Sequence, residues 1–339
     1  MNKMTTIKEM AQFLKVSPST ISKALSDSPE ISQTTKRRVR ETAEALSYVP
    51  NHHARSLKSK TTRTIGVIVP NVIDDFFAKV LHGIEKEASR HGFTILVTFS
   101  NDRKKSECKN LLSLINHSVD GILISFSKET QKSNDYSNIK RILNYGLPMV
   151  MFDRVHRELP IDSVTIDDFK GASMATKYMH DTGCKKIAFL SPIANTSVGR
   201  SRKEGYLSAF KSIGDQSMAP FSIEFNDYTA FRETFPRLMI EHSFDGILAA
   251  DELSAIHALN TLQQLGHQVP KKASVIGFTN GPMARVSNPA LSVVSQHAER
   301  IGRMSFQLIG DRIINPQRKN KRIVLRPELV LRDSTKKMK

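Results

Sequence analysis

From residue 64 almost to its end, the chain alternates short apolar runs rich in β-branched residues with longer amphipathic stretches. The first run starts at Thr64, is stopped by Pro70, and is followed by an amphipathic stretch from Phe76 to His91. Comparable runs occupy 94–99, 121–125, 149–152, 163–166, 187–190, 246–249 and 273–278. Strands and helices that alternate in this way predict parallel sheets covered by helices on both faces.

The number of runs indicates more than one sheet. The chain has 339 residues, more than a usual domain of about 100 to 200 residues, and the predicted strands are too many for one small sheet. The sequence therefore predicts an α/β body of two lobes. Ligands of such proteins bind between the lobes, at the carboxyl ends of the strands.

The first fifty residues follow a different pattern. Thr6 and Glu9 are spaced as a capping box that starts a helix near residue 7, and Ser17-Pro18 starts a second helix. A third helix is expected after Ser32. Only about three residues separate the first two helices, which is the spacing of a helix-turn-helix.

In a helix-turn-helix the second helix enters the major groove, with its N-terminal residues against the base edges. The outward-facing residues of this helix are Pro18, Ser19, Thr20, Ser22 and Lys23. Lys23 can donate to guanine O6 and N7, so it is the best single candidate for reading a base. The alternative for the hydroxyl residues is an ordinary surface position, and for Ser17 a role as helix cap outweighs base contact.

Positive charge gathers at the two ends of the chain. The formal net charge is +17, and residues 1–60 hold 11 Lys and Arg against 5 Asp and Glu. Residues 318–339 hold 9 against 2, so the body between them is nearly balanced. A basic head suggests a polyanionic partner, because phosphate neutralisation dominates nucleic-acid affinity. A solvated charged face is the alternative that charge alone leaves open.

A polar, basic stretch at residues 51–60 follows the third helix. Leu57 is its one large apolar residue and has no obvious core to join. An isolated exposed leucine is ordinary, but an apolar side chain flanked by cations is also how proteins open a minor-groove step and kink the duplex.

The head and this stretch resemble, without gaps, the DNA-binding module of the lactose-repressor (LacI/GalR) family. The resemblance rests on residues 6–11, 16–25 and 46–51. It implies a helix-turn-helix domain at 1–50 and a hinge helix at 51–60 that folds only on operator DNA, with Leu57 as the minor-groove lever. The candidate DNA-binding residues are Thr6, Ser17, Pro18, Ser19, Thr20, Ser22, Lys23, Asn51, His52, Arg55, Leu57 and Lys58.

The body resembles the periplasmic-binding-protein-like core of the same family, so the likeness covers essentially the whole chain. Its markers lie at 69–71, 119–122, 152–154, 183–188, 202–206, 244–247 and 275–278. The resemblance implies an effector-binding and dimerisation core at 61–339, with crossings between the lobes near 162, 292 and 323. The first subdomain would comprise about 61–162 and 293–322, and the second about 163–292 and 323–339.

Six residues near the predicted strand ends are candidates for the ligand pocket: Phe76, Phe77, Asp153, Arg202, Asp251 and Thr279. Phenylalanine walls, carboxylate acceptors and a guanidinium donor suit a polyhydroxylated or anionic ligand. The resemblance singles out Arg202, which precedes a Gly-aromatic pair as the family's ligand-anchoring arginine does. Core packing of Phe77 and helix capping by Asp251 are the alternatives. Where many sugar-binding members carry an aspartate, this chain has Thr279-Asn280.

Motifs of enzymes and metal sites are absent from the sequence. No GxGxxG follows a strand, and no GxxxxGK[ST], GxSxG or HExxH occurs. Cys108 and Cys184 are far apart and lack the spacing of a zinc site or a disulfide framework. We therefore expect a protein that is not an enzyme and that uses no cofactor or metal.

The expected function is that of a bacterial transcriptional regulator, a repressor because the family mostly represses. No apolar run approaches about 18 residues and no signal peptide opens the chain, so we expect a cytoplasmic protein, at the nucleoid, that does not contact the membrane. These features and the attached head oppose a transport-type solute-binding protein. We expect a homodimer on a palindromic operator. The expected effector is a sugar or sugar derivative, and a purine or another metabolite is the alternative.

Overall fold

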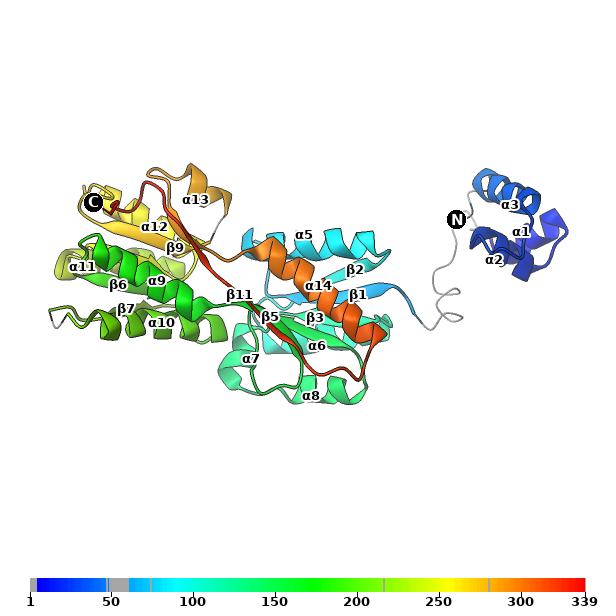
Figure 1. Ribbon diagram of the computed structural model, residues 1–339, viewed down its shortest axis with the longest axis horizontal. Coiled ribbons are helices and arrows are strands. Elements are labelled where there is room, and N and C mark those ends of the chain that lie inside the picture. The colour runs from blue at the N-terminus through cyan, green and yellow to red at the C-terminus, as the bar shows by residue number, and fades with distance from the viewer. Residues whose placement is uncertain are drawn as a thin grey trace. The chain divides into compact units, whose positions relative to one another are not determined.

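The computed structural model describes residues 5–46, 48, 61–73, 75–215, 217–279 and 281–338. The chain divides into two compact units, Met1–Thr62 and Arg63–Lys339 (Figure 1).

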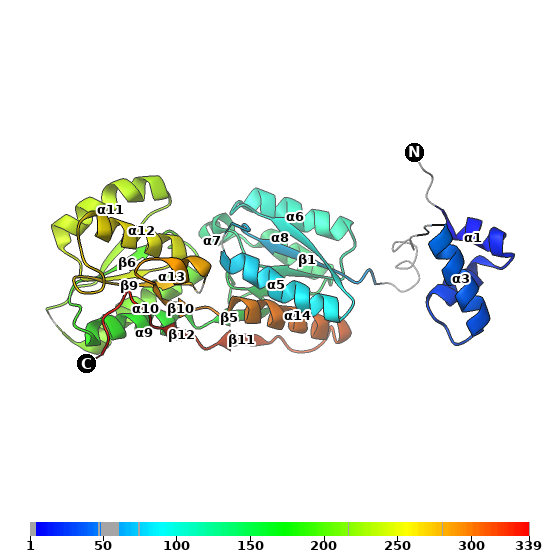
Figure 2. The same cartoon turned by 90° about the horizontal axis from the view of Figure 1, so that it is seen from above.

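The described part of the first unit holds three short helices, α1 (Ile7–Leu14), α2 (Pro18–Leu25) and α3 (Gln33–Ala45) (Figures 1 and 2). The residues before them, Thr6, Ser17 and Ser32, each accept a hydrogen bond from the backbone N–H three residues later. Thr6 and Glu9 form the expected capping box. The helices share a small core of Met10, Ala11, Ile21, Ala24 and Val39. The predicted helix starts are confirmed.

The second unit contains two six-stranded sheets, one in each lobe. The strand order is β11-β5-β4-β3-β1-β2 in the first sheet and β12-β10-β9-β8-β6-β7 in the second. Neighbouring strands are parallel throughout, except that β12 runs antiparallel to β10. The prediction of two parallel α/β lobes is confirmed.

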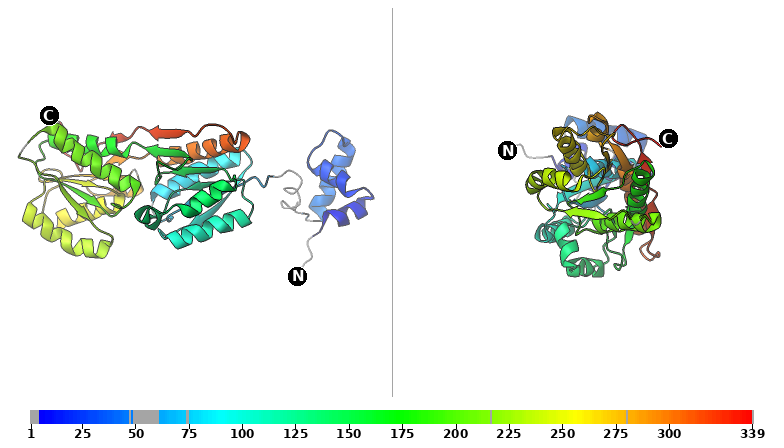
Figure 3. Two further views of the ribbon diagram at one scale, coloured as in Figure 1. Left: turned by 90° about the horizontal axis from the view of Figure 1, so that it is seen from below. Right: turned by 90° about the vertical axis from the view of Figure 1, so that its left-hand side faces the viewer.

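Helices cover both faces of the first sheet (Figure 3). Its strands are β1 (Thr64–Val69), β2 (Thr94–Phe99), β3 (Gly121–Ile124), β4 (Met149–Phe152), β5 (Asp162–Ile166) and β11 (Arg322–Leu325). Its helices are α5 (Asp75–Arg90) and α14 (Ala298–Ile314) on one face, and α6 (Lys104–Asn116) and α8 (Ser137–Asn144) on the other, with the short α7 (Lys128–Ser133) beside them. A separate apolar cluster fills each side of the sheet.

The second lobe repeats this arrangement. Its strands are β6 (Ile187–Ser191), β7 (Phe221–Glu224), β8 (Gly246–Ala249), β9 (Ser274–Phe278), β10 (Ser292–Ser295) and β12 (Glu328–Val330). Its helices are α9 (Asp168–Asp181) and α10 (Ser197–Ile213) on one face, and α11 (Tyr228–His242), α12 (Glu252–Gln264) and the short α13 (Pro282–Val286) on the other. No described helix has the length and apolar character that a membrane span requires.

Strand pairing corrects the expected positions at which the chain passes between the lobes. β5 pairs with β4 and β11 in the first sheet, whereas β10 pairs with β9 in the second. The expected crossings near 162, 292 and 323 fall at the starts of these paired strands, where the chain cannot yet leave its sheet. The crossings follow Ile166, Ser295 and Leu325 instead, and the subdomain bounds move with them.

Helices α5 and α14 lie side by side and approach each other unusually closely (Figures 1 and 2). A Cβ atom added to Gly83 would lie 2.2 Å from the Glu299 carbonyl oxygen, and one added to Gly302 would lie 2.0 Å from the Val80 carbonyl oxygen. Only glycine permits such an approach of two backbones. The packing holds α14 in place directly after the crossing that follows β10.

Candidate functional site

The N-terminal half of α2 carries the hydroxyl residues expected at the DNA. The exposed candidates in this unit are Thr6, Ser17, Pro18, Ser19 and Ser22. Ser17 Oγ accepts the Thr20 N–H at 3.0 Å and also lies 2.8 Å from Thr20 Oγ1. Ser17 is thus a helix cap, the alternative that the sequence favoured for it. Asn51, His52, Arg55, Leu57 and Lys58 lie outside the described residues.

Lys23, the candidate base reader, is half-buried and forms an ion pair with Glu30. Glu30 lies in the turn between α2 and α3, and its side chain is 65% exposed. The sequence pattern does not reveal this partner, because the seven-residue separation crosses a turn. An exposed ion pair contributes only about 0 to 1 kcal/mol. Glu30 can therefore orient the lysine without preventing it from binding DNA.

Asp27 engages two of the cations of α3. Its carboxylate lies 3.1 Å from Lys36 Nζ and 2.8 Å from Arg40 Nη2. The hydrogen bond and the charge of Lys36 lower the pKa of Asp27 below its ordinary value. Part of the basic character of the head therefore serves the packing of α3 on the turn after α2.

Lys23→Ala should relax base preference rather than weaken DNA binding uniformly. A lysine contact to guanine contributes about 1 to 3 kcal/mol of discrimination, which is about five- to 150-fold in relative affinity. Selection from random duplexes followed by titration of the selected sites would measure it. An equal loss on every sequence would assign Lys23 to the phosphate backbone instead.

In the second unit, all six candidate ligand residues line one small cavity between the lobes, about 50 Å³ in volume. They are Phe76, Phe77, Asp153, Arg202, Asp251 and Thr279. The first three come from the first lobe and the others from the second, as expected for residues at strand ends. Arg154 and Gln296 also line the cavity and were not singled out in the sequence.

Arg202 is the most completely enclosed charged group of this cavity, with 2% of the residue exposed. Its Nε donates to Asp168 Oδ1 at 2.7 Å, and its Nη1 donates to the Ala250 carbonyl oxygen. The guanidinium lies over the Phe278 ring, 4.1 Å from the ring centre. Its Nη2 is buried and has no hydrogen-bond partner among the described residues. A buried donor without a partner is costly, so this atom marks where a ligand acceptor would bind.

Two candidates have the roles that were their alternatives. Phe77 is 1% exposed and packs in the core beneath α5, edge-on to Phe76 at 5.2 Å between ring centres. Asp251 caps α12 by accepting the Ser254 N–H at 2.8 Å, and its other oxygen accepts from the Tyr228 hydroxyl. Both still border the cavity, but Phe77 has no polar side-chain atom, and each oxygen of Asp251 already accepts a hydrogen bond.

The remaining candidates are also held by the protein. Asp153 is buried with a φ of 57° and lies 4.0 Å from Arg154, which in turn pairs with Asp102 at 2.5 Å. Thr279 Oγ1 accepts the Gly281 N–H at 2.9 Å. The polar wall of the cavity is therefore pre-arranged. Across the described residues, no group of three or more His, Cys, Asp or Glu could hold a metal ion.

A helix-turn-helix unit and a two-lobed core with a polar cavity between its lobes define the class of ligand-controlled DNA-binding regulators. Residues 6–51 match the bacterial regulatory proteins of the lacI family, and residues 176–335 match the periplasmic binding protein-like domain. The chain therefore joins a DNA-binding domain of the lacI family to a periplasmic binding protein-like domain.

Relatives align along its whole length. The chain is 29% identical to the HTH-type transcriptional repressor PurR of Mannheimia succiniciproducens over 338 residues, which are 99% of this chain and 100% of that protein. It is 28% identical over 338 residues to the ribose operon repressor of Haemophilus influenzae, again 99% and 100% of the two chains. The solved lac repressor dimer, bound to operator and the anti-inducer ONPF, has the same fold, with a TM-score of 0.87, 19% identity, and coverage of 98% and 99%.

Proposed function

We propose that this protein is a transcriptional repressor whose affinity for its operator is set by a small molecule bound between the two lobes. The observation that carries this proposal is the buried Nη2 of Arg202, which has no partner among the described residues, in a chain with a helix-turn-helix head. The head has no enzymatic motif beside it, and we infer that the protein acts without catalysis, on DNA in the cytoplasm.

The proposed division of labour follows the chain. Residues 1–50 read the operator, residues 51–60 form a hinge helix on DNA, and the remainder binds the effector and dimerises. Two copies would match a palindromic site and double the contact with DNA. The relatives named as a PurR repressor and a ribose operon repressor support a repressor role.

The proposed mechanism is a linkage between two sites. An effector that binds one arrangement of the lobes better than another changes the population of the state that binds the operator. By the same linkage, operator DNA changes the affinity of the protein for the effector by the same factor. We propose a sugar or sugar derivative as effector. A purine is the second candidate, because the chain is 29% identical to a protein named PurR.

The proposal is tested by operator selection with the full-length protein, followed by titration of operator binding with sugars, sugar phosphates and purines. A compound supports the linkage if it shifts operator affinity and if operator shifts the affinity for the compound in the same direction. A compound that weakens operator binding should bind more weakly when operator is present, and one that strengthens operator binding should bind more tightly. Effector binding without any change of operator affinity would contradict it.

Leu57→Ala should weaken operator binding by about tenfold or more while leaving nonspecific binding nearly unchanged, if Leu57 is the proposed minor-groove lever. The reason is that an apolar wedge stabilises a kinked duplex, whereas nonspecific affinity comes from phosphate contacts. Operator and random duplexes would be titrated at one salt concentration. Equal losses on both would rule out the lever.

A further inference from the structure

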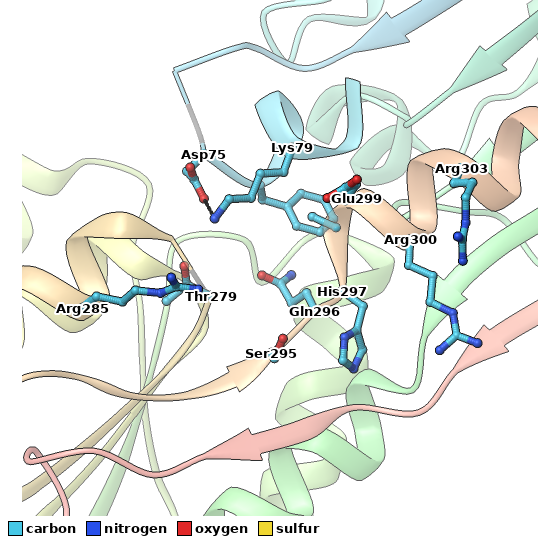
Figure 4. Close-up of a pocket in the computed structure, with 12 residues that line it drawn as sticks. Asp75, Lys79, Thr279, Arg285, Ser295, Gln296, His297, Glu299, Arg300 and Arg303 are labelled. Carbon is cyan, nitrogen blue, oxygen red and sulfur yellow. Dashed lines mark ion pairs between the residues drawn. The ribbon is translucent and has the colours of Figure 1, made fainter. Parts of the chain in front are cut away.

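A second, larger cavity of about 390 Å³ opens beside the small one and shares Phe76, Thr279 and Gln296 with it. Figure 4 shows its walls: the start of α5, the first turns of α14, and Arg285 of α13. We call it the outer pocket. Because the outer pocket shares three lining residues with the small cavity of Arg202, one ligand can occupy both.

The carboxylates around this space are already engaged. In the outer pocket Asp75 pairs with Lys79 at 2.7 Å, the contact drawn in Figure 4, and Glu299 pairs with Lys86 at 3.2 Å. The Lys86 hydrogen bond lowers the pKa of Glu299. Three carboxylates line the inner cavity. Asp153 lies 4.0 Å from Arg154, Asp251 accepts hydrogen bonds from Ser254 and Tyr228, and Glu252 accepts one from the Ala284 N–H at 3.3 Å. A neutral sugar, whose hydroxyls donate as well as accept, would find few acceptors here.

Hydrogen-bond donors, in contrast, remain available. Arg202 Nη2 has no partner among the described residues. Arg285 is exposed and forms no hydrogen bond or ion pair with the described part of the chain, and its positive charge helps to lower the pKa of Arg332. The helix α14 begins at Ala298 without a side-chain cap, and its first turn lines the outer pocket. The N-terminus of a helix of 17 residues favours anions.

The cations of the outer pocket do not all face its centre. In Figure 4 Arg285 extends towards Thr279, whereas Arg300 and Arg303 lie beyond Gln296 and His297, on the other side of the view. Lys79 is paired with Asp75, so Arg285 is the cation placed to meet a ligand that also reaches the inner cavity. Arg303 lines the same pocket but is not placed to meet such a ligand.

We infer that the effector is an organic anion whose phosphate or carboxylate binds at Arg285 and the first turn of α14, with the rest of the molecule reaching Arg202. This inference rests on the proposed function and narrows its effector class. Arg202 Nη2 and the Arg285 guanidinium have no partner among the described residues, whereas the carboxylates beside them are already hydrogen-bonded or ion-paired. A ligand rich in acceptors fits this arrangement best. Charge-assisted hydrogen bonds to guanidinium and helix N–H groups are the strongest that such a site can offer.

A third cavity, of about 530 Å³, lies along β5 and β11, and the charges that line it differ from those of the outer pocket. It is lined by cations and acids together, among them Arg157, Arg200, Asp167 and Glu204. In the third cavity three arginines face four acidic residues, whereas the outer pocket is lined by four Lys and Arg residues against two acids, Asp75 and Glu299.

The test uses inorganic phosphate as probe, titrated into full-length protein at low ionic strength, with binding measured by calorimetry and thermal stability. Chloride at equal ionic strength is the salt control. We expect phosphate to stabilise the wild type and Arg285→Gln to weaken phosphate binding about tenfold or more. Arg303→Gln removes the same charge nearby and should change the affinity little. No stabilisation beyond that of chloride, or equal losses in the two variants, would overturn the inference.

A second arm compares glucose, gluconate and glucose 6-phosphate. Stronger binding of gluconate points to a carboxylate, and stronger binding of glucose 6-phosphate points to a phosphate. Glucose binding as tightly as both acids contradicts the inference. The proposed function is judged separately. A neutral compound that shifts operator binding through Arg202 would support the proposed function and contradict the anionic effector. Phosphate that binds at Arg285, with no effector changing operator affinity, would support the anion site and contradict the proposed function.

Discussion

Replacing Arg202 with Ala is expected to abolish the effect of the effector on operator binding. The guanidinium supplies the buried donor that has no partner within the described residues, and it is stacked on Phe278 at 4.1 Å. Loss of a charge-assisted hydrogen bond in a buried site, together with the loss of shape, should lower effector affinity by about 100-fold or more. Operator binding without effector should be retained, and titration of operator DNA in the presence and absence of effector would measure both.

The same substitution should also destabilise the core, because it leaves Asp168 buried without its cation. Burial raises the pKa of Asp168 and Arg202 opposes this effect. Breaking a buried ion pair from one side costs about 3 to 5 kcal/mol. The double variant Arg202→Met with Asp168→Asn removes both charges and should recover most of this stability, yet still not respond to effector. A double variant that responds normally would exclude Arg202 from the pocket.

Gly302→Ala is expected to destabilise the first lobe strongly. The added Cβ would lie 2.0 Å from the Val80 carbonyl oxygen, and a backbone atom cannot rotate away as a side chain can. Helices α5 and α14 would have to separate, and such overpacking costs about 1 to 3 kcal/mol or more. The midpoint of thermal or urea unfolding should fall accordingly.

Gly310 provides a matched control in the same helix. Nothing lies within 4 Å of a Cβ added there, so Gly310→Ala should stabilise α14 by about 0.5 to 1 kcal/mol through helix propensity alone. Opposite signs at the two glycines would establish the close approach of α5 and α14. A stabilising effect at both positions would show that the two helices are not in contact at Gly302.

Some strands of the second unit could not be found from their own residues. β7, β11 and β12 are edge strands of three or four residues with partly exposed side chains, and the buried β10 reads Ser-Val-Val-Ser. None of them has a long apolar stretch, and the alternation of β7, Phe-Ser-Ile-Glu, covers only four residues. Their positions depend on pairing with strands far away in the sequence. The same pairing places the crossings between the lobes later in the chain than the sequence predicted.

The sequence by itself determined what local chemistry controls: the helix starts at Thr6, Ser17 and Ser32, the alternating strands and helices, and the residue types at the strand ends. Only the tertiary structure decided which polar atoms remain available there. Both oxygens of Asp251 accept hydrogen bonds, one from Tyr228 and one from the first turn of α12, whereas Arg202 has one buried donor without a partner among the described residues. The physical reason is that a side chain's type is local, but the partners that satisfy or leave open its hydrogen bonds come from segments up to tens of residues away.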